Sequence, residues 1–60
     1  MKILSYKEVH KLTQSFIDIV NILEPKHDTS GYQETLDAGC ANHGHMLALS
    51  TKVVDLIKHP

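Results

Sequence analysis

Apolar residues recur at helical spacing along the first third of the chain, and this pattern limits what the chain can fold into. The residues are separated by alternating steps of three and four: Val9, Leu12, Phe16, Ile19 and Leu23. Such steps place all five side chains in one stripe along a helix. The stripe predicts a helix over residues 6–24, which Pro25 ends because the residue before a proline avoids helical geometry.

The start of this helix is marked by two signals. Ser5 and Glu8 have the spacing of a capping box, in which the serine hydroxyl accepts from the Glu8 amide. Leu4 and Val9 stand at the positions of a hydrophobic staple, which packs the incoming chain against the first turn. Both signals predict that helical geometry begins directly after Ser5.

A second helix is predicted over residues 31–58, after a polar connection. Asp28, Thr29 and Ser30 are all suitable caps for it, and Ser30 forms a second, weaker capping box with Gln33. Steps of three and four again connect one set of residues: Tyr32, Leu36, Cys40, His43, Leu47, Ser50, Val54 and Ile57.

Two glycines lie inside this second predicted helix. Gly39 and Gly44 each cost a helix roughly 1 kcal/mol relative to alanine. They mark either a close backbone contact or a break. Residues 38–41 are all small, so close contact with the first helix is the favoured interpretation, and we expect the second helix to be continuous.

Residues 1–60 are therefore expected to form one all-α domain, an antiparallel two-helix hairpin. Six of the eight residues from 16 to 23 are apolar, although one partner helix covers only one stripe. We expect two hairpins to pair into a four-helix-bundle homodimer, or one hairpin to bind another protein. The side chains left over by the hairpin are the predicted partner-binding residues: Ile17, Val20, Ile22, Met46, Leu49 and Leu56.

Composition argues against several classes of function. The formal net charge is −1, and the six basic residues are scattered lysines with no arginine. Direct nucleic-acid binding is therefore not expected, because it needs a basic face. No apolar run approaches the length of a membrane span. Cys40, the single cysteine, has no partner for an internal disulfide, which favours a reducing cytoplasm.

One cluster suggests an alternative function. Cys40, His43 and His45 lie close in sequence, and the hairpin brings His10 near them. These residue types bind zinc, but His43 and His45 point about 200° apart on a continuous helix, by the 3.6-residue turn. No metal or cofactor is therefore expected. A metal-responsive or pH-responsive module using these four residues is the alternative, since histidines titrate near neutral pH.

An enzyme is not expected. Residues 27–30 contain the side-chain types of a hydrolytic triad, His-Asp-Thr-Ser, but consecutive loop residues do not converge as nucleophile, base and orienting group. The sequence instead predicts a small interaction module, a regulator or antagonist of the antirepressor or inhibitor type. Its apolar helix faces would cover part of a larger protein.

Overall fold

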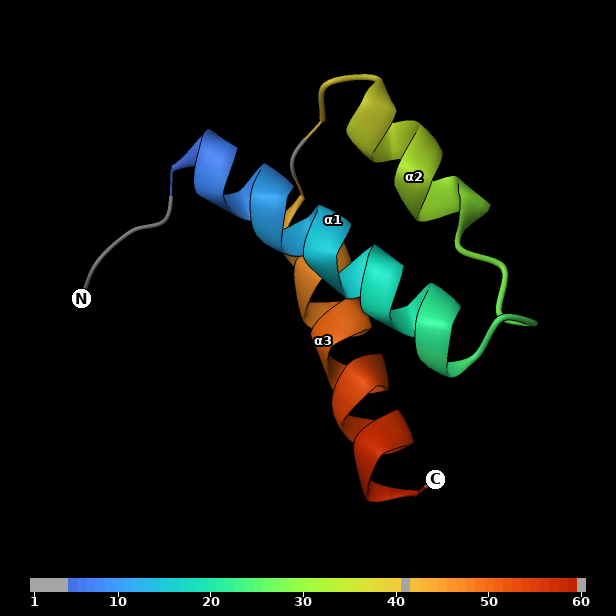
Figure 1. The fold of residues 1–60 in the computed structure, drawn as a ribbon. Helices are drawn as coiled ribbons and strands as arrows, with labels where there is room; N and C mark the ends of the chain where they lie inside the picture. The colour runs from blue at the N-terminus through green and yellow to red at the C-terminus, as the bar shows by residue number, and fades with distance from the viewer. Residues whose placement is uncertain (1–4, 41, 60) are drawn as a thin grey trace.

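A computed structural model describes residues 5–40 and 42–59, which form three helices (Figure 1). They are α1 (Tyr6–Leu23), α2 (Ser30–Asp37) and α3 (His43–Lys58). These residues contain no strand, so the all-α prediction is confirmed. The two-helix hairpin is wrong, because the predicted second helix consists of two helices. Leu4, and with it the predicted staple, lies outside the described residues.

α1 forms where the sequence predicts it. The Ser5 Oγ accepts from the backbone N–H of Glu8 at 3.2 Å, which confirms this half of the capping box. The last helical residue is Leu23, and the backbone N–H of Glu24 still donates to the Val20 carbonyl at 2.7 Å. Pro25 follows, so the helix ends within one residue of the predicted boundary.

The break between α2 and α3 is produced by Gly39. This residue has a φ of +85°, a left-handed conformation that side chains with a Cβ rarely adopt. Its backbone N–H donates to the Leu36 carbonyl at 3.0 Å, and the next N–H, of Cys40, donates to Thr35 at 3.1 Å. These two bonds form a Schellman motif, which ends a helix. The glycine therefore marks a helix end, and the predicted continuous helix over 31–58 is wrong.

Asn42 starts α3. Its side-chain oxygen accepts from the backbone N–H of His45 at 3.2 Å, which is N-cap geometry. Gly44 lies in the first turn, where a Cβ would stand only 3.0 Å from that same Asn42 oxygen. The second glycine therefore leaves room for the cap.

α2 is capped by a residue just outside it. The Asp28 carboxylate accepts from the backbone N–H of Ser30 at 3.0 Å, whereas Thr29 makes no side-chain cap. Ser30 is already helical, so the Ser30–Gln33 capping box is not formed. The amide of Gln33 bonds instead to α1.

α1 lies between the other two helices, both of which pack against it (Figure 1). The core combines one stripe of α1 with residues of α2 and α3. Phe16 and Tyr32 are half-buried and pack against this core. The buried apolar residues are Val9, Ile17, Val20, Leu36, Leu49 and Val53.

Polar contacts hold α2 against α1. The side-chain amides of Gln14 and Gln33 bond reciprocally, with N–O distances of 3.0 and 2.8 Å. At the N-cap of α2, the Thr29 hydroxyl donates to the Asn21 side-chain oxygen at 2.9 Å. These contacts fix which side of α1 faces α2.

Candidate interaction surface

Three of the predicted partner-binding residues are part of the chain's own core. Ile17 and Val20 are 0% exposed and Leu49 is 1% exposed. The expectation that these side chains lie outside the core of a single chain is therefore wrong. The physical reason is the break at Gly39: α1 is covered by two helices rather than one, and Ile17 and Val20 lie where these helices meet it.

The other three predicted residues lie nearer the surface. Ile22 is 76% exposed, whereas Met46 and Leu56 are half-buried. Ile22 alone among the six is thus fully available to a partner in this structure. The premise of surplus apolar side chains still holds, but it applies to a different set of residues.

Three of the exposed apolar side chains of α1 form a row, which we call the α1 stripe: Leu12, Ile19 and Leu23. Tyr6 and Ile22 are also exposed but lie outside this row. The apolar spacing predicts these residues to face the partner helix of a hairpin. Gln14 and Asn21, which contact α2, lie on the opposite side of α1 from Ile19, given 100° of rotation per residue. The α1 stripe is therefore on the side away from α2, with half-buried Phe16 between it and the core.

α3 has a comparable feature, the α3 stripe, formed by Leu47, Val54 and Ile57. Leu47 is 62% exposed and Ile57 is 65% exposed. The second half of α3 runs past α1 toward the C-terminus (Figure 1). The sequence pattern again identifies an apolar stripe correctly but assigns it to the wrong side, because Leu49 and Val53 form the buried side of this helix.

Charged groups lie at the edges of the core. Lys52 Nζ of α3 is 2.9 Å from the Glu24 carboxylate at the end of α1, with both side chains about one-third exposed. A hydrogen bond from Lys52, together with its positive charge, lowers the pKa of Glu24. Hydrogen bonds from the Ser30 side chain and backbone lower the pKa of Asp28. Both carboxylates are therefore more stable as anions in the folded chain.

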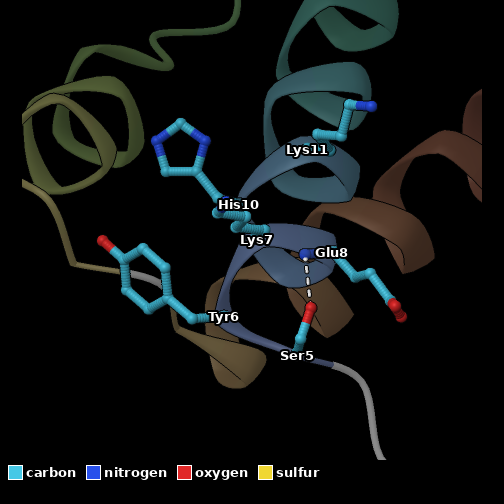
Figure 2. A pocket seen from close by; sticks show the side chains of 6 residues that line it. All are labelled: Ser5, Tyr6, Lys7, Glu8, His10 and Lys11. Carbon is cyan, nitrogen blue, oxygen red and sulfur yellow. Dashed lines mark hydrogen bonds between the residues drawn. The ribbon is translucent and has the colours of Figure 1, made fainter.

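A shallow hollow lies beside the first turns of α1, lined by Ser5, Tyr6, Lys7, Glu8, His10 and Lys11 (Figure 2). The Tyr6 and His10 rings lie on one side of the helix, 6.2 Å apart, and the Glu8 side chain extends away from them. Ser5 is engaged in capping the helix. Among these six residues, the side-chain contacts found are the Ser5 cap and the Tyr6–His10 ring pair.

The residues of the predicted metal alternative do not converge. Within residues 5–40 and 42–59, no group of three or more His, Cys, Asp or Glu side chains is placed to hold a metal ion. Two of the histidine rings have an aromatic neighbour instead: His10 lies beside Tyr6, and His45 forms a T-shaped contact with Tyr32, with ring centroids 5.1 Å apart. Cys40 is exposed. The metal hypothesis therefore has no geometric support among the described residues.

Comparisons with protein-family models, with curated proteins and with solved structures find no match to this chain. Among the described residues, no helix has both the length and the apolar character needed to cross a bilayer.

Proposed function

We propose that this chain is a non-enzymatic protein–protein interaction module that regulates a larger protein, as an inhibitor or antirepressor does. The observation that supports the proposal is the pair of exposed apolar stripes on α1 and α3. Single exposed apolar residues are ordinary, but rows of them on helices are typical of interaction sites. The lone exposed Cys40 agrees with action in a reducing cytoplasm.

The binding mechanism would be helix packing. In the α1 stripe, Leu12, Ile19 and Leu23 are at the i, i+7 and i+11 positions, which an apolar helix of the partner covers along its length. Each fully buried leucine or isoleucine gains roughly 1.5–3 kcal/mol, so a few of these side chains supply useful affinity. Either stripe can contact the partner. The most exposed apolar side chains are Ile22, which lies beside the α1 stripe, and Ile57, which belongs to the α3 stripe.

A second copy of the chain is one such partner, and we retain the homodimer as part of this proposal. A chain of 60 residues buries a small core, and association is a common way to add to it. Size-exclusion chromatography with light scattering tests the dimer. Twice the chain mass supports self-association, and a monomer mass at micromolar concentration removes the dimer but leaves the larger partner.

Site-specific photo-crosslinking in the producing cell tests the interaction itself. A benzophenone amino acid replaces Ile22 or Ile57, and we expect a discrete adduct with a larger protein. The same probe at Gly31 is the control, because this helix position is exposed and a side chain there meets nothing within 4 Å.

Charge substitutions then connect the adduct to the stripes. With the probe at Ile57, Leu47→Asp should abolish the α3 adduct, whereas Gly31→Asp adds the same charge elsewhere and should leave it intact. Circular dichroism checks that the variants remain helical. If neither stripe forms an adduct above the level at Gly31, the proposed function is wrong.

A further inference from the structure

The spacing of the α1 stripe is that of a seam between two helices. When half-buried Phe16 is included, the row consists of Leu12, Phe16, Ile19 and Leu23, separated by steps of four, three and four. Such steps make the seven-residue repeat by which helices pack along each other in coiled coils. The three stripe residues remain between 36% and 47% exposed, so a further helix can pack along this side of α1.

The row is also complementary to its own reverse. Leucines lie at both ends, at Leu12 and Leu23, and the larger Phe16 and Ile19 lie between them. If a second copy of α1 runs antiparallel, each Leu12 is level with Leu23 of the second copy, and each Phe16 is level with Ile19. Both pairs share one midpoint, so a single two-fold axis generates every contact, as in an isologous dimer.

Charged residues at the two ends of the row favour this antiparallel direction. Glu8 is one turn before Leu12, and its side chain extends away from the rings of Tyr6 and His10 (Figure 2). At the other end, exposed Lys26 follows the helix. Antiparallel pairing brings each Glu8 close to the level of Lys26 of the second copy, whereas parallel pairing places like charges together at both ends, which is unfavourable.

We propose that the occupant of the α1 stripe is a second copy of this chain, with its α1 antiparallel across a two-fold axis. The proposal rests on the proposed function and assigns its two surfaces. The α1 stripe serves self-association, and the α3 stripe, on a different helix, is left for the larger protein.

Cysteine crosslinking tests the direction of the pairing. Leu12→Cys and Leu23→Cys are made separately in a Cys40→Ser background, because Cys40 is exposed. In the antiparallel dimer two copies of the same cysteine are separated by about 16 Å along the helix axis, since the two positions are eleven residues apart. A bismaleimide shorter than this separation should therefore crosslink a mixture of the two variants severalfold more than either variant alone.

A charge substitution tests the seam without any cysteine. Ile19→Asp should raise the dissociation constant of the dimer by about a hundredfold, because one buried isoleucine is lost from each copy. Gly31→Asp is the matched control: it adds the same charge at an exposed position of α2 with open space around it and should leave the dimer intact. Light scattering over a concentration series measures both, and circular dichroism checks that the chains remain helical.

Three results would overturn the proposal: a wild-type chain that stays monomeric, a mixture that crosslinks no better than Leu12→Cys alone, or a helical Ile19→Asp variant that dimerises like Gly31→Asp. Crosslinking confined to the mixture, together with a monomeric Ile19→Asp, supports it. Failure of this arrangement is distinguishable from failure of the proposed function, because the adduct formed by the probe at Ile57 reports on the larger protein and is identified by its mass.

Discussion

Two sides of α1 both carry large aliphatic residues, but one side is buried and the other is exposed to solvent. One side, with Val9, Ile17 and Val20, is buried under α2 and α3, whereas the α1 stripe faces solvent. Apolarity alone does not separate them, because the α1 stripe consists of large aliphatic residues although it is exposed, and the buried side includes Thr13. The side that becomes core is therefore chosen by the other helices, not by α1 alone.

Thr13 illustrates how the buried side accommodates a polar residue. Its hydroxyl donates to the Val9 carbonyl one turn earlier, at 2.8 Å. The hydroxyl is thereby satisfied inside its own helix, and the residue is buried without a partner from another element. A polar residue at this position gave no sequence signal that its side of the helix is the core.

The largest expected contrast between the two sides comes from matched truncations. Ile17→Ala should lower the free energy of unfolding by about 2–5 kcal/mol, because it leaves a cavity in the core. Ile22→Ala removes the same atoms from a side chain that is 76% exposed and should change stability by about 0.5 kcal/mol or less. Urea denaturation measures both. Equal losses would show that Ile22 is covered in solution, as by a second copy.

A smaller change in the free energy of unfolding is expected at Gly39. This residue breaks the chain into α2 and α3 and so determines which side of α1 is buried. Gly39→Ala should cost about 1 kcal/mol, because alanine resists the left-handed conformation at φ +85°. Gly31→Ala is the matched control: it lies in α2 with open space around its Cβ and should stabilise by up to about 1 kcal/mol. Opposite signs in thermal or urea unfolding support the assignment of Gly39. A stabilising Gly39→Ala would indicate that α2 and α3 merge into one helix.

The smallest change in stability is expected at low pH, where Glu24 at the edge of the core becomes protonated. The pKa of Glu24 is lowered in the folded chain, so its contribution to stability is present above the unfolded value and is lost as pH falls through the lower folded value. With an ordinary value of 4.5, the loss begins below about pH 4.5. Unfolding of wild type and Glu24→Gln should therefore converge as pH falls toward 3. A gap that widens instead would contradict the sign of this shift.

Sequence reasoning located α1 to within one residue, because capping, apolar spacing and Pro25 all agree there. It failed at Gly39, where a run of small residues suggested close contact. The missed signals were local: a glycine followed three residues later by Asn42, a good N-cap. A helix interruption of this kind is hard to separate from a tight helical contact without knowing the backbone angle.

The incorrect prediction of one continuous helix also placed the candidate interaction surface on the wrong residues. With one long partner helix, the residues spaced as Leu12 and Ile19 would be core, and Ile17 and Val20 would be surplus. With two shorter helices, Ile17 and Val20 belong to the core, whereas Leu12 and Ile19 are exposed. The surplus of apolar residues could be predicted because it depends on composition and spacing, whereas its position depends on tertiary packing, which local spacing does not determine.

The reciprocal amide pair of Gln14 and Gln33 has its own consequence. Neither side chain ionises, so ionic strength has little effect on their mutual bonds. High salt would weaken the Lys52–Glu24 bridge between α1 and α3 while sparing the amide contact between α1 and α2. The resulting loss of stability should be small, because a partly exposed ion pair contributes about 0–1 kcal/mol and the buried Leu49 and Val53 still hold α3 in the core.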